Sequence, residues 1–134
     1  MAARGKANGQ YQGSKWIRRE KRLAIYLRDG LACAYCGATI EDGASLTLDH
    51  LTPYCEGGSN HEHNLVTACL RCNSSRANRS VEGFAGVVAA YLDRGATAEA
   101  IVGHINETIE RPLDIAQAKA IIANRGSWAE ALKR

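Results

Sequence analysis

Two pairs of cysteines constrain this chain more than any other feature of its sequence. Cys33 and Cys36 form one Cys-x-x-Cys unit, Cys69 and Cys72 form a second, and 32 residues separate the two units. One such unit also occurs in thioredoxin-like redox sites, whereas two units are typical of a tetrahedral site with four thiolate ligands. We therefore expect these four cysteines to hold one zinc ion. Because four thiolates leave no open coordination position, this zinc should be structural. Cys55, the fifth cysteine, is expected to be a free thiol.

Charge is distributed unevenly along the 134 residues, although the net charge is only +3. Residues 1–30 carry eight Lys or Arg and two acidic residues, a local charge of +6. Residues 31–69 carry no Lys or Arg and five acidic residues, a local charge of −5, and residues 70–80 return to +3. Basic segments on both sides of an acidic, cation-binding centre suit a metal-dependent enzyme that acts on a polyanion.

Two classes of protein are not indicated by the sequence. No run of apolar residues approaches the length of about 18 that a transmembrane helix needs. The N-terminal segment is basic and polar and lacks the apolar stretch of a secretory signal. We therefore expect a cytoplasmic protein, in which cysteines serve as metal ligands more often than as disulfides.

The central region is predicted to form a ββα unit. Alternation of apolar and polar residues predicts a short strand over 46–50, and a second strand is predicted over 65–68. A loop rich in Pro and Gly separates the two strands. A helix is expected to follow directly, from the second cysteine pair to about residue 78. Strand, loop, strand and helix in this order make up the predicted core.

The flanking segments are predicted to be helical, which gives an α+β class overall. We expect a disordered tail over 1–13, then a basic helix over 15–28 that Ser14 caps and Asp29-Gly30 closes. The predicted domains are the tail at 1–13, the core with its basic helix at 14–80, and a helical extension at 81–134. The helices predicted in the extension run from Ser80 to about Arg94, from Thr97 to before Pro112, from about Asp114 to Arg125, and onward from Ser127.

Residues suited to phosphodiester hydrolysis lie within the predicted ββα unit. That reaction needs an activated water, a cation near the phosphorus and help for the leaving oxygen. His50 is the natural general base, because histidine exchanges protons close to neutral pH. Asp49 and Asn73 offer the hard oxygens that Mg²⁺ prefers, and Asn64 should hold the loop so that His50 is oriented. In a regular strand Asp49 and His50 point to opposite faces, so both can serve one site only if the strand bends or ends there.

In these residues the chain resembles the HNH endonucleases, which have the ββα-metal fold, over about residues 23–80. The resemblance implies His50 as general base, Asp49 and Asn73 as ligands of a catalytic Mg²⁺ or Mn²⁺, Asn64 as the orienting residue, and the four cysteines on zinc. Many similar small proteins are encoded by phages or mobile elements and act on DNA in the bacterial host cell. The family often has His at the third motif position, where this chain has Asn73. The matching segments are Cys33-x-x-Cys36, Asp49-His50, Pro53, Gly57-Gly58, Asn64-Leu65 and Cys69-x-x-Cys72-Asn73.

Basic residues on either side of the ββα unit are candidates for contact with DNA phosphates. A solvated surface without a ligand is the other interpretation of such residues. The candidates are Arg18, Arg19, Lys21 and Arg22 in the first helix and Arg76 and Arg79 in and after the helix of the core.

The leading hypothesis is a metal-dependent DNA endonuclease that makes a nick or a double-strand break. One alternative is a zinc-dependent nucleic-acid-binding module without catalysis, which the joint presence of Asp49, His50, Asn64 and Asn73 disfavours. Another is an assembly factor whose C-terminal helices dock a phage terminase or another protein partner. The second alternative is compatible with the leading hypothesis.

Overall fold

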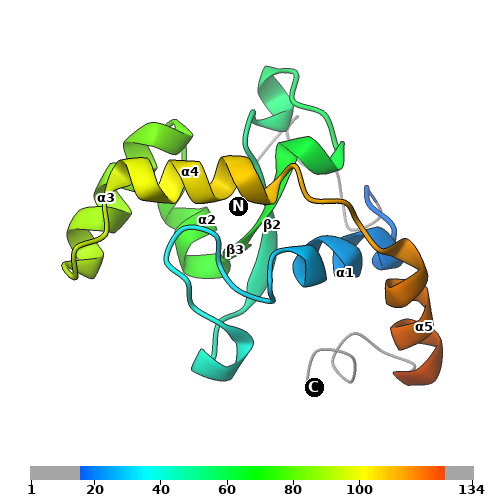
Figure 1. The fold of residues 1–134 in the computed structure, drawn as a ribbon. Helices are drawn as coiled ribbons and strands as arrows, with labels where there is room; N and C mark the ends of the chain where they lie inside the picture. The colour runs from blue at the N-terminus through cyan, green and yellow to red at the C-terminus, as the bar shows by residue number, and fades with distance from the viewer. Residues whose placement is uncertain (1–15, 126–134) are drawn as a thin grey trace.

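A computed structural model of the chain describes residues 16–125 and shows a two-stranded sheet with helices around it (Figure 1). The α+β class predicted from the sequence is confirmed. Within residues 16–125, three short 3₁₀ turns lie in the connections, at Ile40–Asp42, Tyr54–Glu56 and Glu62–Asn64. The longer elements are, in chain order, α1 (Arg19–Arg28), β2 (Leu46–His50), β3 (Leu65–Cys69), α2 (Leu70–Arg76), α3 (Val81–Leu92), α4 (Ala98–Thr108) and α5 (Ile115–Arg125).

The hairpin of β2 and β3 lies at the centre of the described structure (Figure 1). The strands pair antiparallel, with Leu46 opposite Cys69 and His50 opposite Leu65, and β3 is buried along its whole length. The strand predicted over 46–50 is confirmed, and β3 is one residue longer than predicted. α2 follows β3 without a connection, so the predicted ββα unit is present. It ends at Arg76, two residues early, because Ala77 has φ +48°, a conformation that a helix cannot continue.

The first helix is shorter than predicted. Arg18 is extended and α1 begins at Arg19, whereas the sequence predicted a start at Lys15. The side chain of Ile17 is buried, and the ring of Trp16 lies against the ring of His50. We attribute the late start to these tertiary contacts, which outweigh local helix propensity. The predicted tail, the Ser14 cap and the last short helix from Ser127 lie outside the described residues.

The pair of helices α3 and α4 shares one hydrophobic core with the cysteine-containing segments. Ser80 and Thr97 cap these helices as predicted, accepting hydrogen bonds from the backbone N–H groups of Gly83 and Ala100. α3 and α4 are therefore packed against the ββα unit by their apolar side chains. The buried residues that α3 and α4 contribute are Phe84, Ala85, Val88, Ile101 and Ile105.

α5 packs against α1, on the other side of the hairpin from α3 and α4 (Figure 1). Ala118 of α5 is fully buried in a cluster with Leu23 and Ala24 of α1. The carboxylate of Asp114 accepts a hydrogen bond from the backbone N–H of Gln117 and caps the helix. Among the helices of residues 16–125, none is long and apolar enough to cross a bilayer.

Candidate metal centre and active site

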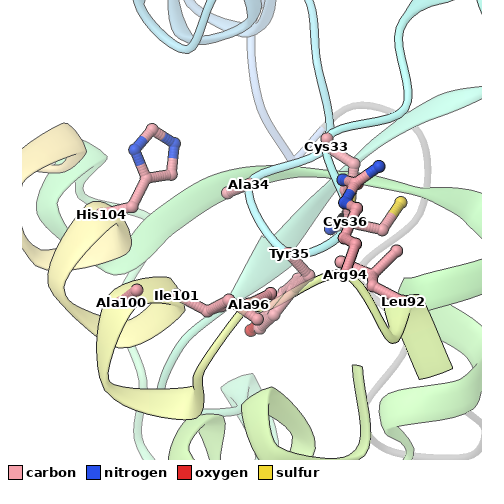
Figure 2. Close-up of a pocket in the computed structure, with 11 residues that line it drawn as sticks. Cys33, Ala34, Tyr35, Cys36, Leu92, Arg94, Ala96, Ala100, Ile101 and His104 are labelled. Atoms are coloured by element: carbon pink, nitrogen blue, oxygen red, sulfur yellow. Dashed lines mark hydrogen bonds between the residues drawn. The ribbon is translucent and has the colours of Figure 1, made fainter. Parts of the chain in front are cut away.

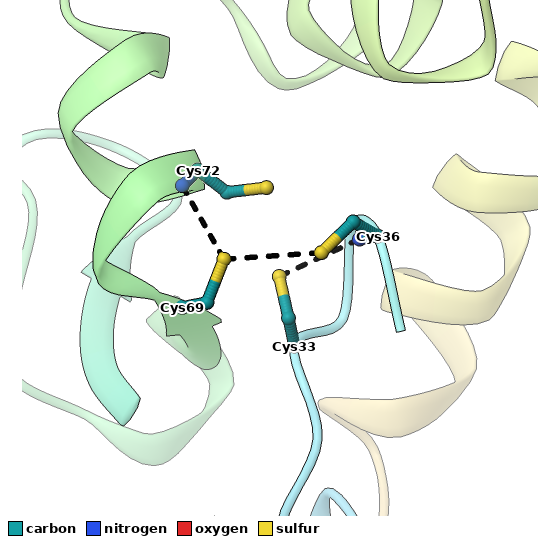
Figure 3. Close-up of side chains that lie close together, drawn as sticks. All are labelled: Cys33, Cys36, Cys69 and Cys72. Atoms are coloured by element: carbon teal, nitrogen blue, oxygen red, sulfur yellow. Dashed lines mark hydrogen bonds between the residues drawn. The ribbon is translucent and has the colours of Figure 1, made fainter. Parts of the chain in front are cut away.

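The four cysteines of the two pairs meet in one buried cluster (Figure 3). Their sulfur atoms all lie within 4.8 Å of one another, and the Sγ atoms of Cys36 and Cys69 are 3.8 Å apart. Zinc at its usual ~2.3 Å from each sulfur places tetrahedral thiolates about 3.8 Å apart. The donor set and its spacing therefore fit a structural zinc ion, as the sequence predicted.

Electrostatics of the cluster also favour a bound cation. A hydrogen bond from Cys72 lowers the pKa of Cys33 to about 5. The same bond raises the pKa of Cys72, and burial raises that of Cys36. Negative charge on Cys33 contributes to both increases in pKa. One cysteine of the cluster therefore ionises readily, and ionisation of the others is disfavoured. A zinc ion would remove this conflict, because thiolates bound to it are deprotonated.

Backbone geometry forms the two turns, or knuckles, that present the cysteines. In the first knuckle, Cys33–Cys36, the N–H of Cys36 points to Sγ of Cys33 at 3.4 Å, and Gly37 closes the turn with φ +82°. The N–H of Ala34 donates to the carbonyl of Thr67, which attaches this knuckle to β3. The second knuckle, Cys69–Cys72, is the junction of β3 with α2. Four ligands from two distant segments are thereby brought together.

Asp49 lies at the buried, α2-facing side of β2. Its Oδ2 accepts a hydrogen bond from the hydroxyl of Tyr35 at 2.7 Å and one from Nη1 of Arg76 at 2.6 Å. Burial raises the pKa of Asp49, and the positive charge of Arg76 opposes that shift. Both hydrogen bonds end on Oδ2, so among the described residues Oδ1 has no hydrogen-bond donor.

Arg76 is buried, whereas a residue that contacts DNA phosphates must be exposed. The residue is 4% exposed. Besides Asp49, its guanidinium donates to the backbone carbonyls of His50, Leu51 and Arg79 at 2.8–3.0 Å. A guanidinium with four internal acceptors is not available to a phosphate at the surface, and the sequence-based assignment of Arg76 is corrected accordingly.

Asn73, on the first turns of α2, reaches the same strand. Its Nδ2 donates to Oγ1 of Thr47 at 2.9 Å and to the carbonyl of Leu48 at 3.2 Å. Within residues 16–125 no donor contacts Oδ1 of Asn73, as is also true of Oδ1 of Asp49. These two hard oxygens, both at the α2-facing side of β2, suit a Mg²⁺ or Mn²⁺ ion chemically.

His50 is the last residue of β2 and faces the opposite side of the strand from Asp49. Its Nε2 lies 2.8 Å from Oδ1 of Asn60. The imidazole ring is 4.9 Å from the ring of Trp16 and 6.3 Å from that of Tyr54. The strand thus keeps regular alternation through Asp49 and His50, and it ends at His50. Of the two arrangements that the sequence left open, the strand end is the one observed.

Asn64 bridges the two ends of the loop that follows β2. Its Oδ1 accepts from the backbone N–H of Thr52, and its Nδ2 donates to the carbonyls of Thr52 and Ser59 at 3.1 and 2.8 Å. Gly58 is buried in this loop, where an added Cβ would collide with the carbonyl oxygen of Thr52. The loop that carries Asn60 toward His50 is therefore fixed at both ends.

Three of the six basic candidates are exposed. Arg18 and Arg19 lie at the start of α1, and Arg79, whose Nη1 donates to the carbonyl of Ser75 at 2.6 Å, lies beyond the end of α2. Each leaves its charge at the surface, where a phosphate can approach it.

Two further candidates have internal contacts as well. Nζ of Lys21 donates to the carbonyl of Asn60 at 3.0 Å and lies 3.6 Å from the carboxylate of Glu62. The guanidinium of Arg22 lies over the ring of Trp16, 5.5 Å from its centroid. Both residues therefore support the surroundings of His50 from the side of α1.

A cavity of about 290 Å³ lies beside the first knuckle, between it and the turn from α3 to α4 (Figure 2). Its lining includes Cys33, Tyr35 and Cys36 of the knuckle, Arg94 beside Cys36, and His104 of α4. The lining does not include the residues expected to act in catalysis. This cavity therefore lies next to the four-cysteine cluster and apart from the candidate catalytic residues.

Comparison with known proteins agrees with this arrangement. Residues 33–79 match the family described as HNH endonuclease. The match begins at the first knuckle, passes through both strands and ends just after α2. These residues form an HNH endonuclease domain.

Relatives of the HNH domain occur within much longer proteins. The CRISPR-associated endonuclease Cas9 of Actinomyces naeslundii is 48% identical over 58 residues, which are 42% of this chain and 5% of that protein. The Cas9 of Corynebacterium diphtheriae is 42% identical over 52 residues, 38% of this chain and 5% of that protein. The chain thus spans only a small part of the length of these curated relatives. No solved structure is similar enough to count as a match.

The sequence does not indicate the hydrogen-bond partners of the candidate residues His50 and Asp49. Asn60 beside His50, and Tyr35 beside Asp49, were not singled out. Tyr35 lies inside a Cys-x-x-Cys unit, where a tyrosine has no required role, and Asn60 is one of several polar residues in its loop. Neither position carries a local signal that would distinguish it.

Proposed function

We propose that this chain hydrolyses phosphodiester bonds in DNA, with His50 as general base and one Mg²⁺ or Mn²⁺ ion held by Asp49 and Asn73. The observation that carries the proposal is the fixed imidazole of His50 at the end of β2, inside an HNH domain. The relatives are endonucleases by name, which supports a nucleic acid as substrate.

Asn60 determines which nitrogen of His50 can accept a proton. Because Oδ1 of Asn60 can only accept a hydrogen bond, Nε2 of His50 must carry the hydrogen. Nδ1 then has the free lone pair and takes the proton from an attacking water. Trp16 and Tyr54 limit rotation of the ring by their contact with it.

Oδ1 of Asp49 and Oδ1 of Asn73 would hold the divalent ion, which when bound supplies positive charge for the phosphate and the leaving oxygen. The side chains of Asp49 and Asn73 lie on the α2-facing side of β2, whereas the side chain of His50 lies on the side of α1. A DNA strand that crosses the end of β2 therefore meets the base and the ion from two sides. Asn64 contributes by closing the loop next to His50.

The exposed basic residues at the start of α1 and after α2 support DNA as the polyanion. Arg18 and Arg19 on one side and Arg79 on the other would contact phosphates and add affinity without reading sequence. Docking of the C-terminal helices on a phage packaging complex stays a prediction of the sequence.

The test is cleavage of supercoiled plasmid by the purified zinc-loaded chain with Mg²⁺ or Mn²⁺. His50→Ala should lower the cleavage rate by roughly 10²–10⁴, the usual contribution of a general base. Zinc content and circular dichroism should remain as in the wild type, because His50 lies outside the hydrophobic core.

Two variants make this test specific. Asp49→Ala should also lose cleavage, but excess Mn²⁺ should restore part of it, because the loss is one of ion affinity. His104→Ala, which removes an exposed histidine of α4, should cleave at the wild-type rate. Wild-type cleavage by His50→Ala would refute the proposal.

A further inference from the structure

Tyr35 connects the zinc centre to the strand that carries the proposed active site. It lies between two zinc ligands, Cys33 and Cys36, and is 3% exposed. Its hydroxyl donates to Oδ2 of Asp49 at 2.7 Å. A residue of the first knuckle therefore touches the carboxylate that is proposed to bind the catalytic ion.

Both donors to Asp49 are themselves held firmly. The ring of Tyr35 packs edge-on against Phe84 of α3 with their centroids 5.1 Å apart. Arg76 donates to the carbonyls of His50 and Leu51 at 3.0 and 2.8 Å, in addition to Asp49 at 2.6 Å. Neither donor can follow the carboxylate if it rotates, so together they determine where it points.

We propose that Tyr35 and Arg76 are positioning residues for Asp49. They hold Oδ2 and leave Oδ1 as the oxygen presented to the divalent ion. Because the backbone of Tyr35 belongs to the zinc knuckle, the structural zinc site determines the geometry of the catalytic ion site. This inference rests on the proposed function, since it takes Asp49 as a ligand of the ion.

Hydrogen bonds to a ligating carboxylate commonly account for roughly 10–100-fold in metal affinity or activity. Tyr35→Phe removes one such bond and retains the aromatic ring in the core. The chain offers a matched control in Tyr26, a buried tyrosine whose hydroxyl donates to the carbonyl of Leu46 on the same strand. Tyr26→Phe also removes a buried hydroxyl next to β2, but at the end of the strand away from Asp49.

The experiment measures Mn²⁺ binding to the zinc-loaded full chain by electron paramagnetic resonance, for wild type, Tyr35→Phe, Tyr26→Phe and Asp49→Ala. We expect Tyr35→Phe to bind Mn²⁺ about tenfold more weakly and Tyr26→Phe to bind it as the wild type does. In plasmid cleavage, Tyr35→Phe should need a correspondingly higher Mn²⁺ concentration and approach the wild-type rate at saturation.

Wild-type Mn²⁺ affinity in Tyr35→Phe, with binding lost in Asp49→Ala, would overturn this inference and leave the proposed function intact. Wild-type affinity in Asp49→Ala would overturn both. If Tyr35→Phe does not fold with zinc, Arg76→Lys takes its place, because one ammonium group cannot serve Asp49 and both carbonyls at once. Arg76→Lys should also bind Mn²⁺ more weakly, and unchanged affinity there would refute the proposal.

Discussion

Arg76 and Asp49 form an ion pair that water barely reaches, with side chains 5% and 8% exposed. Burial disfavours charge on both groups. The carboxylate of Asp49 and the hydroxyl of Tyr35 nevertheless raise the pKa of Arg76 above its ordinary value. Each charge is therefore tolerated in the interior because the other is present. Removal of one partner is more costly than the pair itself is stabilising.

Arg76→Ala should lower the free energy of unfolding by about 3–5 kcal/mol, the usual cost of leaving a buried charge without its partner. Urea denaturation at neutral pH measures this loss. Arg79→Ala provides the control, since that exposed arginine should change stability by no more than about 0.5 kcal/mol. Similar losses of unfolding free energy in the two variants would show that the buried ion pair contributes no more to stability than an exposed arginine does.

The same variant should show a characteristic dependence on pH. Burial raises the pKa of Asp49 in the folded protein above the unfolded value, and Arg76 opposes this rise. Without Arg76 the folded protein binds a proton over an interval in which the unfolded chain does not. Stability of Arg76→Ala therefore falls as pH rises from the ordinary carboxylate range, near pH 4, through the folded pKa. Its deficit relative to wild type should shrink in acid.

At the scale of elements, the two knuckles contribute stability that a hydrophobic core would otherwise have to supply. β2 and β3 form a sheet of only two strands, which is marginal by itself in water. Cysteines at the end of β3 and the start of α2 share one cluster with the first knuckle. Metal bound there joins a loop, a strand and a helix, so its binding energy contributes directly to folding.

Cys36→Ser should therefore lose the bound zinc and most of the structure of the ββα unit. Metal analysis of the purified protein and thermal unfolding followed by circular dichroism measure both effects. Cys55→Ser is the matched control, because Cys55 is an exposed thiol of the loop after β2. It should keep one zinc per chain and the wild-type melting temperature. Equal zinc content in the two variants would exclude the four-cysteine site.

Elements with a local signature were predictable from the sequence. The strands show alternation, the knuckles show cysteine spacing, and Ser80 and Thr97 are helix caps at the observed positions. The first helix was less predictable, because its start depends on contacts of Trp16 and Ile17 with residues far along the chain.

Buried charge was not predictable in the same way. Arg76 and Asp49 are 27 residues apart, and a basic residue on a short helix ordinarily indicates a surface. Arg28 was likewise counted only as a basic residue. Its side chain pairs with Asp29 and donates to the carbonyls of Glu62 and Leu65. Such pairs depend on the assembled fold, and the sequence alone contains no periodicity that marks them.

At the scale of the whole molecule, α5 returns to cover the basic helix α1. Ala118 is fully buried against Leu23 and Ala24, although about 90 residues separate the two helices. Ala118→Asp places an unpaired charge in this contact, so α5 should detach. Hydrogen exchange should then lose protection in α5 and in the facing part of α1, while protection around the cysteines and zinc content persist.

Ala120→Asp is the control for this change, because Ala120 lies on the same helix and is exposed. Its exchange pattern should match the wild type. Unchanged protection of α5 in Ala118→Asp would mean that this contact does not secure the helix.

The meeting of the four sulfur atoms has a consequence for how such a unit can be reused. Cys33 lies near the start of the HNH domain and Cys72 near its end, yet their sulfur atoms are within 4.8 Å. A unit whose entry and exit are adjacent can be inserted into a connection of another protein without forcing the flanking parts of that host away from each other. A metal ion held by the four cysteines would close the unit from within, because all four ligands belong to it. Similar segments do make up 5% of far longer chains.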